Sequence, residues 1–410
     1  MSQMILQPMI AKIGPIQMKS IRRGQKGVVL VVVVLAVALM ATLMALMIED
    51  QHLFIRKVAN QRVSEQGFQY ANGMNAWASR VLTEDGNPVV DYLGEDWALF
   101  GRPQPEDEDD DDSFSLGANG DEEDEEPPSI DFGVDGVTGV IVDLQGKFNL
   151  NNLANEDRAF VVSQRRILQN LMELLELGEF ADRDQLIENL IDWVDENSTS
   201  RSIGLESNDY RVKDLPYQAA DQKLAALGEL RFIDGFNQDI IKALEPHVTV
   251  LPVDNARINI NTTTTEVLAS LSSTTVADVA SVDTFLSQRL NEDFLGFQAA
   301  QIRDAENAII AVSPVRQPPI ANMMQVTSQY FEIQSRVELG DTVYCMNSLI
   351  LRGGAAAQAG LVAQGQSAGE QLEASSSVPA ISVLRREHSS FCEDQSQIII
   401  QESDEDFSET

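Results

Sequence analysis

The chain contains few of the residues that build redox and metal sites. Its two cysteines, Cys345 and Cys392, are too few for a disulfide framework and lack metal-ligand spacing. They could form one bridge in an oxidising compartment, or Cys392 could stay apart in a mobile tail. The three histidines are scattered along the chain, at His52, His247 and His388. A histidine or cysteine metal centre is therefore not expected.

Positive charge is also scarce. Lys plus Arg total 29 against 64 Asp plus Glu, which gives a formal net charge of −35. Phosphates and anionic headgroups would be repelled by such a chain, so nucleic acid and anionic lipid surfaces are excluded as partners. The segment 256–268 is similar to the helix-hairpin-helix of DNA-binding proteins, but no basic cluster surrounds it.

The sequence shows no catalytic motif with the flanking secondary structure that its chemistry requires. Residues 365–369 (GQSAG) match the pattern of a hydrolase nucleophile elbow. That elbow requires a strand before the serine and a helix after it, whereas this stretch lies in a Gly-, Ala- and Gln-rich tail. We therefore predict that the protein is not an enzyme, although a signal-anchored periplasmic enzyme remains an alternative.

What the chain does contain is a long apolar run near its start. Residues 28–48 carry no charge, Pro or Gly, and as a helix they would span ~30 Å, about one hydrocarbon core. Residues 1–27 carry five basic side chains and no acid, which indicates that the C-terminal bulk faces away from the cytoplasm. The run is too long for a cleavable signal peptide. A plain signal anchor is the simplest alternative.

The junction before this run resembles a type IV prepilin signal, in which a basic leader and a Gly precede an uninterrupted apolar helix. The resemblance implies that a prepilin peptidase cuts between Gly27 and Val28. Most pilins carry Glu at the fifth mature position, where this chain has Val32. A subunit without that acid has no partner for the terminal amine of a neighbour, which suits the tip of a filament.

Three further motifs carry a more specific resemblance. Residues 70–78 (YANGMNAWA), 91–98 (DYLGEDWA) and 143–153 (DLQGKFNLNNL) are similar to stretches of the minor pseudopilin K family of type II secretion. The resemblance covers about residues 22–352. The asparagines of the third motif are expected to supply side-chain amides for turn backbone groups.

The resemblance and the apolar periodicity together predict an α+β fold. A pilin-like long N-terminal helix would pack on a small antiparallel sheet, with a large, mostly helical inserted domain of two SAM-like or helix-hairpin-helix-like modules. The predicted segments are 1–27, a basic prepilin leader; 28–48, the transmembrane part of the helix; 49–102, its amphipathic continuation and a loop; 103–128, an acidic disordered insertion; 129–157, pilin-like strands; 158–255 and 256–324, two helical modules; 325–352, a C-terminal hairpin; and 353–410, a disordered tail.

One constellation favours a bound cation. Oxygen-bearing side chains recur at short spacing after a predicted helix, in 192–197 (DWVDEN) and 204–210 (GLESNDY). Calcium takes six to eight hard oxygen ligands, and the family resemblance implies calcium here. The candidate ligands are Asp192, Asp195, Asn197, Glu206 and Asp209. The alternative is a solvated helix end above a buried Tyr210.

The resemblance implies a minor pseudopilin at the tip of the type II secretion pseudopilus, which acts in export of folded proteins from the periplasm across the outer membrane. Implied partners are minor pseudopilins of types I and J, the major pseudopilin, the prepilin peptidase and the secreted substrates. The implied location is a single pass through the bacterial inner membrane, with the C-terminal body in the periplasm. A type IV pilus-like minor pilin is the other alternative.

Overall fold

The computed structural model describes eleven stretches of the chain: 26–84, 89–99, 136–179, 182–201, 203–213, 215–272, 277–291, 294–310, 320–340, 342–353 and 380–389. The predicted acidic insertion, most of the predicted leader and most of the predicted tail lie outside them. Two compact units are present, 1–62 and 63–410.

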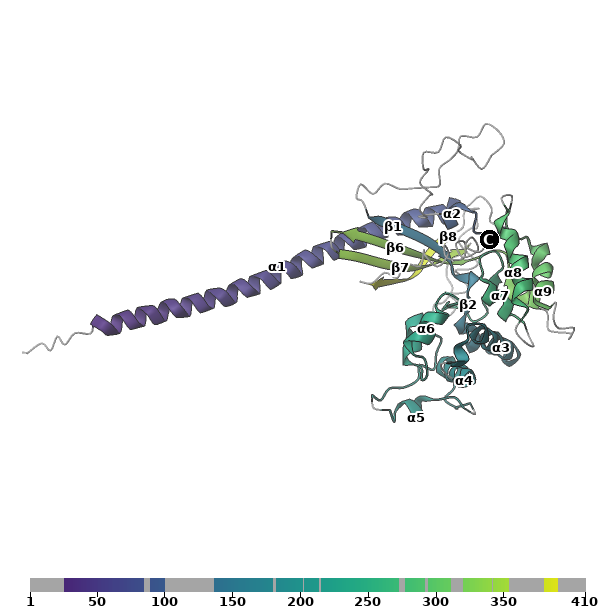
Figure 1. Ribbon diagram of the computed structural model, residues 1–410, viewed down its shortest axis with the longest axis horizontal. Helices are drawn as coiled ribbons and strands as arrows, with labels where there is room; N and C mark the ends of the chain where they lie inside the picture. The colour runs from purple at the N-terminus through teal and green to yellow at the C-terminus, as the bar shows by residue number, and fades with distance from the viewer. Residues whose placement is uncertain are drawn as a thin grey trace, which may run out of the picture. The chain divides into compact units, whose positions relative to one another are not determined.

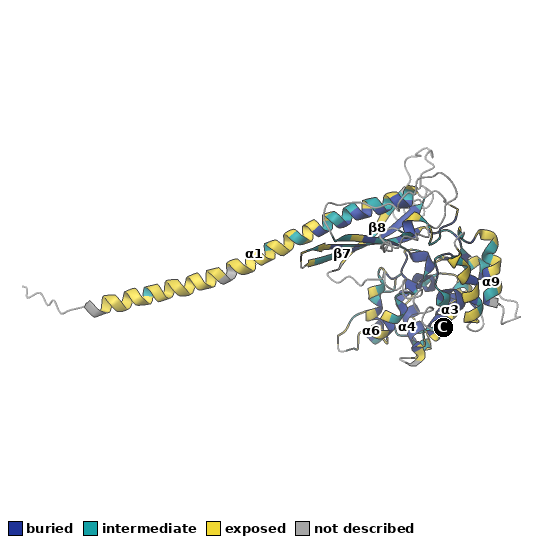
Figure 2. Ribbon diagram, turned by 45° about the horizontal axis from the view of Figure 1, so that its top comes forward, coloured by how far each residue is buried: buried dark blue, intermediate teal, exposed yellow. Residues whose placement is uncertain are grey.

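The first unit consists of the N-terminal part of helix α1 (Lys26–Glu84). The apolar side chains between Val28 and Ile48 are mostly exposed, and Figure 2 shows this part of α1 in yellow. By length and composition, α1 is the one helix of the described chain that could cross a membrane. Exposed Val and Leu side chains on an isolated helix lack the burial that stabilises a soluble protein, so the predicted single-pass anchor agrees with this exposure.

The second unit contains the remainder of α1, which packs on a sheet. The C-terminal half of the predicted amphipathic continuation buries its apolar stripe, at Ala71, Met74, Ala78 and Leu82, whereas Phe54 and Ile55 of the N-terminal half are exposed. Gly67 lies against β7, because a Cβ placed on it would come within 2.7 Å of Tyr344 Cβ. This glycine therefore permits a close approach of helix and sheet.

The sheet has four antiparallel strands in the order β1-β6-β7-β8. They are β1 (Val137–Asp143), β6 (Tyr330–Leu339), β7 (Thr342–Gly353) and β8 (Ala380–Ser389), of which β1, β6 and β7 are seen side by side in Figure 1. The predicted hairpin is confirmed, since Leu339 pairs with Thr342 across a tight turn. Gly340 has φ +62, the left-handed conformation that such a turn requires.

Strand β8 corrects the prediction that 353–410 is entirely a disordered tail. Residues 380–389 pair with β7 from Gly353↔Ala380 to Cys345↔Ser389. The strand has only two β-branched residues, Ile381 and Val383, and its second half is polar, so it lacks the apolar periodicity that the prediction required. Cys345 is disulfide-bonded, and the only other cysteine of the sequence, Cys392, lies outside the described residues.

A mostly helical body is inserted between β1 and β6. These strands are antiparallel neighbours in which Asp143 lies opposite Phe331, so the chain leaves and re-enters the sheet at one place. The helices of the body are gathered beside that end of the strands (Figure 1). Its elements of four or more residues are α3 (Arg158–Leu174), α4 (Arg183–Val194), α5 (Ser207–Tyr210), α6 (Gln238–Leu244), α7 (Thr265–Ser270), α8 (Val279–Leu286) and α9 (Ile302–Ile310), with 3-10 turns at Leu150–Ala154, Leu227–Phe232, Ser287–Leu290 and Ile320–Met323.

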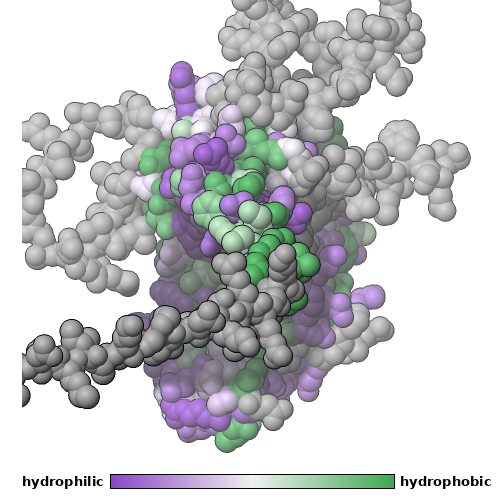
Figure 3. Space-filling view, turned by 90° about the vertical axis from the view of Figure 1, so that its left-hand side faces the viewer, coloured by the Kyte–Doolittle hydropathy of each residue, from purple (hydrophilic) through white to green (hydrophobic). Residues whose placement is uncertain are grey.

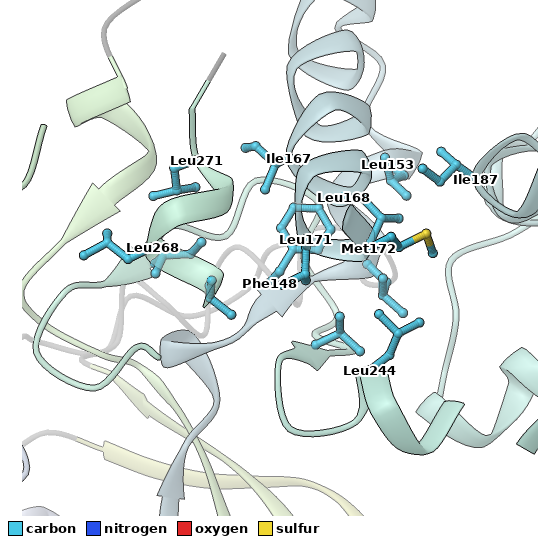
Figure 4. Packing of buried hydrophobic residues seen from close by; sticks show 14 of the residues in the cluster. Phe148, Leu153, Ile167, Leu168, Leu171, Met172, Ile187, Leu244, Leu268 and Leu271 are labelled. Carbon is cyan, nitrogen blue, oxygen red and sulfur yellow. The ribbon is translucent and has the colours of Figure 1, made fainter. Parts of the chain in front are cut away.

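The two predicted helical modules share one hydrophobic core. Ile167, Leu168 and Leu171 of α3 lie at its centre (Figure 4). Leu268 and Leu271, from the second predicted module, lie on one side of α3 in that view, with Ile187 of α4 and Leu244 of α6 on the other, all in one cluster of buried residues. The body therefore packs as a unit, and 255/256 is not a boundary between separate cores.

Buried asparagines of 143–153 hold the body together, although the sequence predicted amides for nearby turn groups. Asn151 Nδ2 donates to the carbonyls of Leu224 and Leu251, at 2.9 and 2.7 Å, and Asn152 Nδ2 donates to that of Ala256 at 3.0 Å. These amides satisfy backbone groups of segments 73 to 104 residues away. The pairing of β2 (Phe148–Asn149) with β3 (Val248–Thr249) is too short to satisfy those groups.

The same device recurs at β4 (Ile258–Asn259), which pairs with β5 (Met324–Gln325). Asn261 accepts from the Phe297 N–H and donates to its carbonyl. Helix α7 begins at Thr265, after Thr264, whose hydroxyl oxygen caps the helix by accepting from the Val267 N–H. Thr263 is buried, and its carbonyl accepts from Arg289.

The surface of the protein mixes residue types. Figure 3 shows hydrophobic and hydrophilic areas interspersed on the face that it presents.

Candidate functional site

An acidic cluster lies where α4 ends and α5 begins. Asp192 and Asp195 are at the C-terminal end of α4, and Glu206 is the residue before α5. Asp192 is fully buried and Glu206 is 3% exposed. Carboxylates at a helix C-terminus oppose the helix dipole, so this cluster needs a compensating positive charge.

The positive charge that the structure supplies is Arg201, from the loop between the two helices. Its Nε lies 3.2 Å from Asp192 Oδ1, and its Nη2 lies 3.5 Å from Asp195 Oδ2. Its backbone N–H also donates to Asp192 Oδ2 at 2.9 Å. Burial nevertheless outweighs the effect of Arg201 and, with the nearby carboxylates Asp195 and Glu188, raises the pKa of Asp192 to about 6.

Glu206 has no such partner. Both of its carboxylate oxygens are buried without a hydrogen bond. Burial, together with the charges of Asp192, Asp221 and Asp195, raises the pKa of Glu206 to about 7. An unpaired buried carboxylate is costly, so its retention needs an explanation.

Asp221 completes the cluster and was missed in the sequence. Its Oδ1 is buried without a hydrogen bond, and its Oδ2 accepts from Ser198 Oγ at 3.5 Å. The residue has φ +48, an uncommon conformation for a residue other than glycine. Its position 15 residues after Glu206 in an irregular stretch gives no periodic signal; a lone acid between Ala220 and Gln222 was the only available sign.

Gly204 makes room for the cluster. A Cβ on this residue would lie 1.9 Å from Asp192 Oδ2. Only glycine lets the backbone of the 203–206 loop approach the Asp192 carboxylate so closely. The 203–206 loop therefore packs directly against the Asp192 carboxylate.

Two of the predicted ligands lie elsewhere. Asn197 is exposed, and its Oδ1 accepts from the Thr199 N–H at 2.9 Å. Asp209 Oδ2 accepts from the Glu206 N–H at 3.0 Å, as the reciprocal half of the α5 cap. The structure therefore brings together Asp192, Asp195 and Glu206, and gives Asn197 and Asp209 local structural roles.

The donor set suits a hard divalent cation. Four carboxylates, three of which have buried oxygens without a hydrogen bond, offer the oxygen ligands that calcium prefers. Among the described residues, no three acidic, His or Cys side chains are close enough together to hold a metal ion as they stand. The guanidinium of Arg201 contacts both Asp192 and Asp195.

Aromatic side chains form the base of the cluster. Trp193 contacts Tyr210 edge to face at 5.3 Å between ring centroids, and Tyr210 packs on Tyr217 at 5.1 Å. Lys213 Nζ lies 4.6 Å from the Tyr210 ring. Tyr210 is buried as expected, and burial raises the pKa of its hydroxyl. These rings fix the two chain segments that carry the acids.

A second buried acidic site joins the sheet to the body. Asp91, which follows α1, is paired with Arg352 at the end of β7 and accepts from the Ser328 N–H. Asp143 Oδ2, at the end of β1, accepts from Ser328 Oγ at 2.5 Å and from Asn259 Nδ2 at 3.1 Å. Burial raises the pKa of Asp91 to about 6 and also raises that of Asp143. The polar partners of Asp91 and Asp143 named here all belong to the sheet or the body, which indicates that this site joins the two parts structurally.

The predicted cleavage position lies at the start of α1. Gly27 and Val28 are the second and third residues of that helix, which begins at Lys26. Val32 is exposed within it. The cleavage itself stays a prediction.

Comparisons with known proteins agree with this architecture. The sequence profile of the family described as "Type II secretion system (T2SS), protein K" matches residues 146–253, which lie in the inserted body. Type II secretion system protein K of Pseudomonas aeruginosa is 29% identical over 343 residues, covering 81% of this chain and 90% of the relative. The protein of that name from Pectobacterium carotovorum is 26% identical over 337 residues, covering 80% and 93%.

A solved structure shares the fold. It is the GspK chain found in the crystal structure of the GspK-GspI-GspJ complex from the enterotoxigenic Escherichia coli Type 2 Secretion System. The two chains align with a TM-score of 0.57 and 22% identity, covering 81% of this chain and 99% of that one. This match fits a pilin-like fold with an inserted body, and the resemblance to the type II secretion system protein K family that the sequence motifs indicated is confirmed by the profile, the relatives and the solved structure.

Proposed function

We propose that this protein is a minor pseudopilin that caps the tip of a type II secretion pseudopilus and acts in the export of folded proteins. The observation that carries the proposal is the insertion of a large helical body into an otherwise pilin-like helix and sheet. The exposed apolar part of α1 suits packing among the helices of neighbouring subunits, first in the membrane and then in the filament.

The proposed partners are minor pseudopilins of types I and J. The solved relative is named as part of a complex with GspI and GspJ, which supports a comparable tip complex here. The major pseudopilin, the prepilin peptidase and the secreted substrates follow from the same proposal. The proposed location is a single pass in the inner membrane with the body in the periplasm, which agrees with one N-terminal apolar helix.

Processing provides the direct test. The peptidase would cut between Gly27 and Val28, and Gly27→Leu should block the cut, since a bulky side chain would replace the small residue before the scissile bond. The mature N-terminus is read by mass spectrometry of membrane-extracted protein, with secretion measured in the same cells. Gly73→Ala, in the same helix but far from the junction, is the control. An unprocessed N-terminus together with intact secretion would contradict the proposal.

We also propose that the acidic cluster binds calcium through Asp192, Asp195, Glu206 and Asp221. Support comes from the unpaired buried oxygens of Glu206 and Asp221 and from the space that Gly204 leaves beside Asp192. When bound, calcium would neutralise these carboxylates and join α4 to the segment around α5. A ligand specific to the folded state raises stability, so the full chain in detergent should melt at a lower temperature in chelator than in calcium. Equal melting curves would contradict a calcium site.

A further inference from the structure

Arg201 occupies part of the acidic cluster in a way that bears on cation binding. Its guanidinium contacts Asp192 and Asp195, and its Nε also lies 3.8 Å from Glu188 Oε2. The other half of the cluster, Glu206 and Asp221, makes no ion pair with any described residue, and three of its four carboxylate oxygens are buried without hydrogen bonds. The positive charge is therefore placed at one side of a site that needs it on both.

Asp192 Oδ1 is the oxygen through which a divalent cation could join the two halves, because Asp192 Oδ2 already accepts the Arg201 N–H and Oδ1 has no hydrogen bond. That oxygen lies 3.2 Å from Arg201 Nε. Two positive charges cannot share one buried carboxylate oxygen at such distances without strong repulsion, which the low local dielectric increases. Binding of the cation and the present position of Arg201 exclude each other.

Arg201 is able to leave. Its side chain is 40% exposed, and it comes from an irregular loop between α4 and α5. Glu188 would retain a partner, because Arg165 Nε already lies 2.8 Å from its Oε1. The backbone N–H of Arg201 could keep its bond to Asp192 Oδ2 after the side chain has moved.

We propose that Arg201 is an internal competitor for the divalent cation. Its guanidinium neutralises Asp192 and Asp195 in the cation-free protein, and calcium binds by displacing it into solvent. This inference rests on the proposed calcium site and concerns how its affinity is set. Arg201 thus stabilises the cluster before calcium arrives and lowers the affinity for calcium, since its contacts must be broken.

The test compares Arg201→Gln with the wild type as full chains in detergent, with calcium added alone. Removing the competitor should tighten calcium binding about tenfold, within the range typical of coupled sites. In chelator the same variant should melt lower than the wild type, because Asp192 and Asp195 lose their counter-charge. Its rise in melting temperature on adding calcium should therefore be the larger. Titration calorimetry gives the affinity and circular dichroism the melting temperature.

Two variants make the comparison specific. Arg201→Lys keeps a positive charge on a flexible stem and should bind calcium nearly as the wild type does. Arg336→Gln removes an arginine of equal exposure, 40%, that pairs with Glu338 on the surface of β6. It should change neither calcium affinity nor the calcium-dependent melting shift. If Arg201→Gln cannot be purified in chelator, it is purified in calcium and its affinity is compared with that of the wild type by competition with a chelating indicator of known calcium affinity.

The outcomes separate the two claims. Calcium binding by the wild type with unchanged affinity in Arg201→Gln would overturn the competition and leave the calcium site standing. Weaker binding in Arg201→Gln would also overturn it, and would make Arg201 a supporting residue. Failure of both proteins to bind calcium would overturn the proposed site, and the competition with it. Tighter calcium binding by Arg201→Gln than by the wild type, with no such change in Arg336→Gln, would establish the competition.

Discussion

Buried carboxylates in this protein differ in how their charge is neutralised. Asp91 is paired with Arg352 and accepts a backbone N–H, and Asp143 accepts four hydrogen bonds. Glu206 is as deeply buried but has no ion pair, and the nearby Ser207 N–H only partly offsets the rise in its pKa. The first two sites are complete within the chain, whereas the third is incomplete, which is why only the third is proposed to bind a cation.

Glu206 gives the cation-free protein a distinct pH dependence. Its pKa is raised from 4.5 to about 7, so between those values the folded protein binds a proton that the unfolded chain has lost. Stability in chelator should therefore fall as pH rises from about 4.5 to about 7. Asp192, with a pKa raised to about 6, contributes in the same direction.

Glu206→Gln separates this effect from the rest of the molecule. At pH 7.5 in chelator the variant should melt about 2 to 4 °C above the wild type, because an unpaired buried charge worth about 1 kcal/mol or more is removed. In calcium the order should reverse, since the variant loses a charged ligand. Melting is followed by circular dichroism at pH 5 and pH 7.5. Asp209→Asn, which alters the neighbouring α5 cap, is the control that should lower stability in both conditions.

Arg352 is predicted to be essential for stability. Arg352→Met leaves Asp91 buried and unpaired near Asp143, which should lower the free energy of unfolding by about 3 to 5 kcal/mol. Arg385→Met removes an arginine of the partly exposed Arg385–Glu387 pair on β8 and should cost about 1 kcal/mol or less. Denaturant unfolding of both variants provides the measurement. Similar small losses in both would contradict a structural junction at Asp91.

Single residues also mark how far the sequence could predict the candidate site. Asp192, Asp195 and Glu206 were identified because acids at short spacing followed a periodic helix. Asn197 and Asp209 share that spacing but bond to nearby backbone groups, a competition that spacing alone does not reveal. Asp221 reaches the cluster only through the tertiary path of an irregular segment, so no local pattern pointed to it.

At the scale of elements, α1 and the sheet are joined by a close approach at Gly67. Gly67→Ala should improve intrinsic helix propensity by up to about 1 kcal/mol. The new Cβ would, however, meet Tyr344 Cβ and Cγ at 2.7 Å, atoms too near the β7 backbone to rotate away. We expect a net destabilisation of about 1 kcal/mol, because overpacking costs more than propensity returns. Gln66→Ala, one residue earlier and exposed, should be neutral or stabilising, and equal effects in both would contradict this packing.

Elements with strong local patterns were predicted and the others were not. The stripe at Ala71, Met74 and Ala78 and the hairpin of β6 and β7 have clear periods of 3.6 and 2. Strand β8 lacks such a period, and its place is set by pairing with β7. The shared core of the body was also missed, because α3 packs on α7 across about 100 residues of sequence.

At the scale of the whole molecule, the body lies beyond the C-terminal end of α1. Asp91, which follows that helix, bonds to Val326 and Asn259 of the body. In a filament built from parallel N-terminal helices, a body at this end would fill the space that the next subunit needs. Bulk at this position, more than the missing acid at Val32, is expected to make the subunit terminal.

The insertion can be removed at a defined place. Asp143 and Phe331 are opposite each other on β1 and β6, so an Asn-Gly turn joining Leu144 to Tyr330 would close a hairpin and leave the four-stranded sheet intact. We expect this variant to be incorporated along the filament, because nothing then blocks addition beyond it. Val32→Glu in the intact protein should leave the subunit at the tip.

Site-specific crosslinking between the subunit and the major pseudopilin measures where the subunit lies in the filament. The intact protein should crosslink on one side only, and the shortened protein on both. Crosslinks of the intact protein on both sides would contradict a tip position, and a shortened protein that stayed terminal would show that a feature other than bulk places it there.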